Sequence, residues 1–153
     1  MKDGSVSLVR LWDVLLLPLQ GEINDAQGEL LCEQVLRHIE LTGPRGLVVD
    51  LSGVAFLDSH LCSTIANLAA AAMLMGTPAF VAGISPQIAM TLETMGVSFR
   101  HLTPVSSLEK AFERLGIERH AAAANSSGSL SDADLIEAIK GSTPATAREE
   151  TKA

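Results

Sequence analysis

Three consecutive residues, Asp58, Ser59 and His60, carry the acid, hydroxyl and imidazole groups of a hydrolytic triad. Consecutive residues cannot assemble a triad, because side chains one position apart on a helix point about 100° away from each other. The glycine-flanked elbow that exposes the nucleophile of an α/β-hydrolase is missing from the sequence as well. The three residues therefore do not predict a catalytic serine, and we do not expect the chain to be an enzyme.

Ser59 has two other chemical uses, as a helix cap and as a phosphate acceptor. It follows an aliphatic run and a short turn, and a long segment typical of a helix begins there. Serine is among the favoured N-cap residues. A hydroxyl at the positive end of a helix dipole can also carry a phosphate, which adds about −1.5 to −2 charges. The two roles are compatible, and the residue pattern on its own favours the cap.

The polar neighbours of Ser59 have supporting roles in both interpretations. Asp58 would either add to the repulsion of an acidic partner or orient the hydroxyl for a kinase. Asp50 and Ser52 come at the end of the preceding aliphatic run. We expect them to shape the turn through side-chain to backbone hydrogen bonds rather than to transfer phosphate.

Metal and cofactor chemistry has no supporting pattern in the sequence. No Cys or His pair has ligand spacing on a shared element, and the histidines are dispersed at His38, His60, His101 and His120. The segment Gly43–Gly46 lies before an expected strand rather than after it, which is the wrong side for a phosphate-binding loop. We therefore predict neither a metal site nor a cofactor.

Composition narrows the class of protein. The 153 residues carry a formal net charge of −7, and 47% of them are hydrophobic. These values are typical of one globular domain and argue against nucleic-acid binding, which needs clustered Lys and Arg. Because no signal-peptide core and no apolar stretch of spanning length occurs, we expect a cytoplasmic protein without a membrane partner. Cys32 and Cys62 lie in apolar helical patterns typical of buried thiols.

Hydrophobic periodicity and turn residues predict alternating strands and helices. The expected strands are two short runs within Leu8–Leu19 that turn near Trp12 and Asp13, followed by Gly46–Leu51, Ala79–Ala82 and Phe99–Leu102. The expected helices run from Asn24 or Asp25 to Thr42, from Ser59 to Met75, from Gln87 to Met95 after Ser85 and Pro86, and from Ser106 or Ser107 to Leu115.

The order β-β-α-β-α-β-α-β-α predicts an α/β fold. We expect a mixed, mainly parallel sheet of about five strands packed against about four helices, all within residues 1–119. Residues 120–153 are rich in Ala and Ser and are expected to form a flexible linker and C-terminal tail. Within the tail, residues 131–140 have the pattern of one short amphipathic helix.

Charge is absent from a long central segment. From Ser59 to Leu92 the sequence contains no Asp, Glu, Lys or Arg. One explanation is that the sheet covers this half of the domain. The other is that part of the helix beginning at Ser59 faces a partner, since solvent-facing helix surfaces usually carry charge. The residue pattern supports the two explanations about equally.

The run Val49-Asp-Leu-Ser-Gly-Val-x-Phe-Leu-Asp-Ser59 resembles the strand, turn and phosphoacceptor corner of STAS domains, the fold of anti-sigma factor antagonists. The resemblance covers about residues 6–118. Many antagonists continue this motif with a second hydroxyl and a glycine, whereas this chain continues with His60-Leu-Cys62. It is similar in this respect to the RsbS type, the small single-domain STAS proteins of the stressosome. Three further stretches carry that similarity: Leu15-Leu-Leu-Pro-Leu-Gln20, Leu74-Met-Gly76 and Val81–Leu92.

The resemblance implies a non-enzymatic phospho-switch and scaffold. Proteins of this type form large homo- or hetero-oligomers with RsbR-type sensors, which carry their own STAS domain, and the complex holds a GHKL-type, RsbT-like serine kinase. Phosphorylation of the serine matching Ser59 releases the kinase into a stress or sigma-factor pathway, and a phosphatase resets the serine.

Two alternatives keep the fold and change the function. One is a stand-alone anti-sigma factor antagonist that binds an anti-sigma kinase directly. The other is a ligand-binding or transporter-associated STAS module, which would hold a ligand and leave Ser59 unmodified.

Overall fold

Two short strands, β1 (Val9–Leu11) and β2 (Val14–Gln20), open the part of the chain that the computed structural model describes, residues 7–117. They pair antiparallel around a turn at Trp12, whose φ of 52° is a left-handed value. The predicted hairpin is therefore confirmed. Because β1 pairs with β2 only as far as Leu16, Pro18 lies beyond its reach, where the missing N–H of proline costs no pairing with β1.

The remaining elements alternate in the predicted order. They are α1 (Asp25–Thr42), β3 (Gly46–Gly53), α2 (Ser59–Leu74), β4 (Ala79–Ala82), α3 (Pro86–Met95), β5 (Leu102–Pro104) and α4 (Leu108–Arg114). Helix starts fall close to the predicted residues because the sequence marks them with caps. Asn24 and Gln27 form a reciprocal capping box on α1, and Ser85 and Ser107 cap α3 and α4.

The last strand differs from its prediction. The apolar pair Phe99 and Leu102 led to a predicted strand between them, but pairing with β4 begins only at Leu102, and β5 ends at Pro104. Phe99 instead packs against the core from a loop, and its carbonyl accepts a hydrogen bond from the Leu102 amide at 3.4 Å. An apolar residue that packs against the core from a loop thus resembles, in the sequence, a residue of a buried strand.

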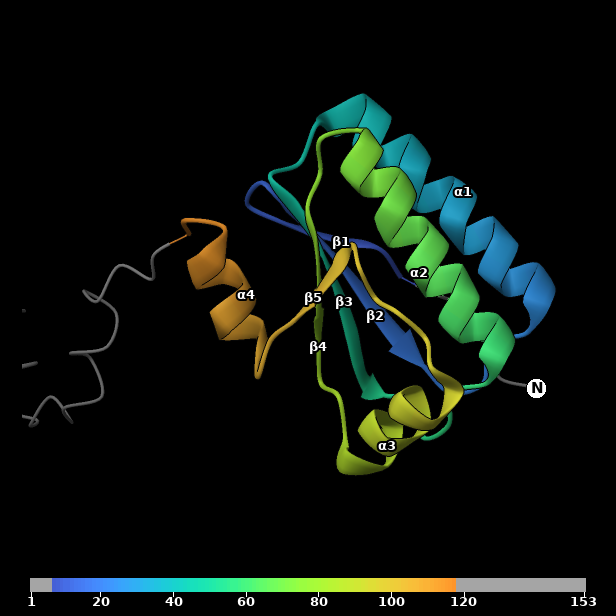
Figure 1. The fold of residues 1–153 in the computed structure, drawn as a ribbon. Helices are drawn as coiled ribbons and strands as arrows, with labels where there is room; N and C mark the ends of the chain where they lie inside the picture. The colour runs from blue at the N-terminus through green and yellow to red at the C-terminus, as the bar shows by residue number, and fades with distance from the viewer. Residues whose placement is uncertain (1–6, 118–153) are drawn as a thin grey trace, which may run out of the picture. The chain divides into compact units, whose positions relative to one another are not determined.

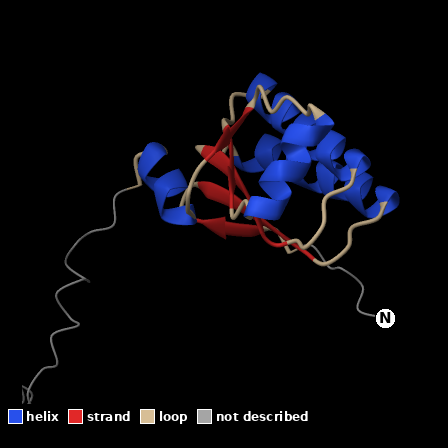
Figure 2. Ribbon diagram, turned by 60° about the horizontal axis from the view of Figure 1, so that its bottom comes forward, coloured by secondary structure: helices blue, strands red, loops and turns tan. Residues whose placement is uncertain are grey.

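The sheet order is β1-β2-β3-β4-β5, and every pair except the first is parallel. Helices α1 and α2 lie side by side over one face, while α4 lies on the other (Figures 1 and 2). The predicted α/β fold, mixed and mainly parallel, is confirmed. The predicted tail, residues 120–153 with its helix at 131–140, lies outside the described residues.

This layering creates two apolar clusters, one under α1 and α2 and one under α4. Neighbouring residues of β3 serve both, since Val49 belongs to the first cluster and Val48 to the second. The first cluster extends past the end of β3, where Val54 and Leu57 are buried in the loop that leads to α2. The loop before Ser59 is therefore anchored to the core.

Candidate functional site

Ser59 is the first residue of α2, and the residue that caps the helix is Asp58. Asp58 has extended backbone angles, φ −88° and ψ 169°, and its Oδ1 accepts a hydrogen bond from the Leu61 amide at 2.7 Å. The prediction that Ser59 itself is the cap is therefore wrong. Aspartate and serine are both favoured caps, but the chain turns helical at Ser59, one residue earlier than it would if Ser59 were the cap.

Ser59 is exposed, and its hydroxyl is free of hydrogen bonds to the described residues. Its backbone carbonyl accepts a hydrogen bond from the Ser63 hydroxyl at 2.9 Å, but within residues 7–117 no hydrogen bond engages the Ser59 hydroxyl itself. Because Asp58 supplies the cap, the Ser59 oxygen can be modified without removing the hydrogen bond that closes the helix. The residue still lies at the positive end of the helix dipole, where a phosphate is tolerated.

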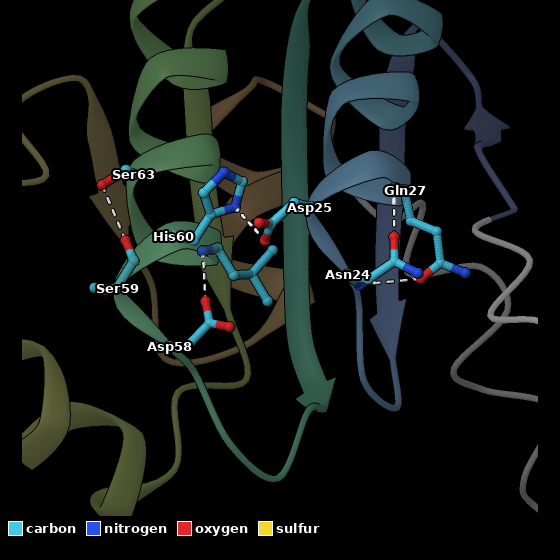
Figure 3. Close-up of polar contacts among 8 residues, drawn as sticks. Asn24, Asp25, Gln27, Asp58, Ser59, His60 and Ser63 are labelled. Atoms are coloured by element: carbon cyan, nitrogen blue, oxygen red, sulfur yellow. Dashed lines mark hydrogen bonds and ion pairs between the residues drawn. The ribbon is translucent and has the colours of Figure 1, made fainter.

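His60 points away from Ser59 and ties the starts of two helices together. Its Nδ1 lies 3.0 Å from Oδ1 of Asp25, the first residue of α1 (Figure 3). Figure 3 shows Ser59 on the opposite side of the first turn of α2 from this pair. The separation agrees with the argument against a triad. Both partners of the pair are exposed, so the contact contributes less than about 1 kcal/mol.

Asp50 and Ser52 form a turn element some distance along the chain from the hydroxyl. Oδ1 of Asp50 accepts a hydrogen bond from the Ser52 amide at 3.0 Å, which confirms the predicted side-chain to backbone contact. A Cβ atom placed on Gly83 would lie only 2.6 Å from that same Oδ1 and from the Ser52 amide nitrogen. The turn is thus packed against the start of the β4–α3 connection, and within residues 7–117 neither residue forms a hydrogen bond with Ser59.

The two cysteines are held as thiols. Cys62 is fully buried, and burial together with the negative charge of Asp58 raises its pKa. Burial also raises the pKa of Cys32, whose Sγ lies 3.8 Å from the Thr64 carbonyl oxygen. Since the thiolate is the reactive form, neither group favours nucleophilic chemistry.

Sequence reasoning missed one exposed feature near Ser59. Phe56, three residues before Ser59 in the β3–α2 loop, has 69% of its surface exposed. Its buried neighbours Val54 and Leu57 hold the loop and leave the Phe56 ring in solvent. An aromatic residue in a turn was a usable signal, because only 3% of this chain is aromatic.

Other kinds of site find little support in the described residues. Over residues 7–117, no group of three metal-ligating side chains gathers closely enough to hold a metal ion. None of the helices in the same range combines the length and apolar character needed to cross a bilayer. A shallow groove lies between α1 and α2; its lining is Glu29, Cys32, Glu33, His60, Thr64 and Asn67.

Comparison with known proteins agrees with this architecture. The STAS domain pattern matches residues 5–115. The RsbT co-antagonist protein RsbRC of Bacillus subtilis (strain 168) is 34% identical over 104 residues, which make up 68% of this chain and 37% of that relative. This chain spans 35% to 42% of the length of the RsbT co-antagonist proteins that it matches.

Two solved structures share the fold. A serine-to-glutamate variant of RsbS from Moorella thermoacetica has a TM-score of 0.65 at 24% identity, covering 73% of this chain and 95% of that chain. A chain from the molecular architecture of the stressosome, described as a signal integration and transduction hub, has a TM-score of 0.61 at 25% identity, covering 72% of this chain and 96% of that chain. Because the family pattern and the observed fold coincide over the same residues, the chain belongs to the STAS domain family.

Proposed function

We propose that this chain is a phospho-switch and scaffold subunit of a stressosome, with Ser59 as its phosphoacceptor. In this role it binds a GHKL-type, RsbT-like serine kinase together with RsbR-type STAS proteins. Phosphorylation of Ser59 releases the kinase to a downstream stress or sigma-factor pathway, and a phosphatase restores the serine. The work of the protein is binding and release rather than catalysis.

The observation that carries the proposal is the free hydroxyl of Ser59 on the first turn of α2. It is exposed, it has no hydrogen-bond partner among the described residues, and it is not needed as the cap. Family membership supports the same role, since the sequence relatives are named as co-antagonists of RsbT. Asp58 beside Ser59 adds a second negative charge to the corner once phosphate is present.

The energy required for release is modest. Weakening kinase binding a hundredfold requires about 3 kcal/mol. An unpaired charge placed in a desolvated interface costs about 2–5 kcal/mol. One phosphate on Ser59 is therefore sufficient to eject a partner that covers this corner.

Incubation of the purified chain with an RsbT-type kinase and Mg-ATP, followed by mass-spectrometric mapping, tests the proposal. We expect phosphate on Ser59 in the wild-type chain and none in Ser59→Ala. A Ser59→Asp chain should bind the kinase at least tenfold more weakly than Ser59→Ala. Phosphate on another residue, or equal binding by the two variants, would contradict the switch.

The size of the assembly tests the scaffold part. On gel filtration with an RsbR-type protein, we expect a particle far larger than a heterodimer. A small one-to-one complex with the kinase, and no assembly with the RsbR-type protein, would instead indicate a stand-alone antagonist.

A further inference from the structure

The outward face of α2 is a continuous strip that begins at Ser59. We define the α2 face by the residues on this side of the helix, which are Ser59, Ser63, Asn67, Ala70 and Leu74. Their spacings of three or four residues place them along one side of a helix. Ala70 is half-buried, and Leu74 at the far end has 91% of its surface exposed.

This α2 face carries no ionisable side chain, in contrast to its neighbour α1. The outward side of α1 presents Glu33, Arg37 and Glu40, all exposed. The two helices lie side by side on the same face of the sheet, and both have one side turned to solvent (Figure 1). Coverage by the sheet therefore explains the buried side of α2, but it does not explain an outer side without charge.

We propose that the α2 face is the docking surface for the kinase that modifies Ser59, with Leu74 as an apolar anchor at its far end. This inference rests on the proposed function. Ser59 is itself the first residue of the α2 face, so a kinase that reaches its hydroxyl approaches α2 from that side. At 1.5 Å per residue the face extends about 22 Å from Ser59 to Leu74. A standard interface covers about 800 Å² of each partner, so an enzyme seated over Ser59 extends along the helix as well.

The chemistry of the face defines the partner surface. Small and uncharged side chains in the middle allow close approach, and Leu74 offers apolar area of the kind found at interface centres. The matching surface of the kinase is therefore apolar and uncharged, whereas a basic, charge-reading partner would be better suited to the acidic groove between α1 and α2. Phosphate on Ser59 would then place its charge at the edge of an apolar contact, which gives release a structural cause.

Matched substitutions on α2 and α1 test this assignment. Leu74→Asp and Ser63→Lys change the α2 face, and Leu41→Asp and Gln34→Lys introduce the same two side chains at exposed positions of α1. Calorimetric titration of each full-length variant with the RsbT-type kinase, without ATP, measures affinity. We expect a 10- to 100-fold loss for the two α2 variants and a change within about twofold for the two α1 variants.

Loss of folding should not account for a difference in affinity, because Leu74 and Leu41 are 91% and 74% exposed. The thermal unfolding midpoints of Leu74→Asp and Leu41→Asp should match that of the wild type. Equal affinities for Leu74→Asp and Leu41→Asp would overturn the inference and leave Ser59 phosphorylation standing. Binding that depends on Leu74 without any phosphate on Ser59 would reject the proposed function and retain the docking face. If Leu74→Asp instead disperses self-associated chains in sedimentation velocity and keeps kinase affinity, the face is an interface between copies and the inference fails.

Discussion

At the amino end of α2, two adjacent side chains divide two tasks. Asp58 accepts a hydrogen bond from the Leu61 amide and so caps the helix. Ser59 presents a free hydroxyl one residue later. A serine that served as the cap would lose its hydrogen bond on modification. Here the phosphate would be added without that loss, so the helix start can remain intact in both states.

The division predicts unequal costs for two neighbouring substitutions. Asp58→Ala should lower the free energy of unfolding by about 1 kcal/mol, because the Leu61 amide loses its acceptor and the helix dipole loses an anion. Ser59→Ala should change it by less than about 0.5 kcal/mol, since its exposed hydroxyl has no hydrogen bond in the described structure. Urea denaturation followed by circular dichroism measures both. A larger loss from Ser59→Ala than from Asp58→Ala would return the capping role to serine.

Among the elements, the junction of β4 with α3 depends on a glycine that leaves no room for a side chain. Gly83 has a φ of 73°, and its Cα faces the Asp50–Ser52 turn at the end of β3. An added Cβ would lie 2.6 Å from the Ser52 backbone nitrogen, and neither group can move without disturbing the strand end. The turn that precedes the switch corner is therefore fixed by a residue from the next strand connection.

Replacing Gly83 should destabilise the fold because the added Cβ would clash with the Asp50–Ser52 turn. We expect Gly83→Ala to lower the free energy of unfolding by about 2–4 kcal/mol, from the left-handed backbone and the steric clash together. Gly76→Ala is the matched control, because Gly76 has a φ of 83° with nothing within 4 Å of the added atom. It should cost about 1 kcal/mol. Equal losses in denaturant titrations would show that backbone conformation alone decides both.

Element identity was readable from the sequence where local chemistry is strong. Caps at Asn24, Ser85 and Ser107 marked helix starts, and the aliphatic run of β3 indicated a strand covered on both faces. The amino end of α2 was less certain, because Asp58 and Ser59 are both good caps and only backbone angles separate them.

Contacts between residues far apart in the sequence could not be predicted from the residue pattern. Nothing local indicates that His60 meets Asp25 on another helix, or that Gly83 supports the Asp50–Ser52 turn. Phe99 misled the strand prediction because burial from a loop gives the same apolar signal as a strand. The phosphoacceptor role of Ser59 came from resemblance to a family, and it remains a proposal.

At the scale of the whole molecule, α4 completes the domain. It lies on the sheet face opposite α1 and α2 (Figure 2), where Ala111 is buried and Phe112 packs against the same cluster as Val48 and Phe80. The ring of Phe112 also meets Trp12 edge-on, with centroids 5.9 Å apart. The last described helix is thus tied to the first hairpin, which joins the two ends of the domain.

Two truncations test where the domain ends. A chain ended after residue 117 keeps every described member of both clusters, so its thermal unfolding midpoint should lie within about 2 °C of the full-length chain. A chain ended after residue 106 loses α4 and exposes Val14, Val48 and Phe80. Uncovering that cluster should cost more than about 5 kcal/mol, comparable with the whole stability of a small domain, so this chain should not fold. Circular dichroism melts of the three chains measure the difference, and a large drop for the first truncation would place part of the fold in residues 118–153.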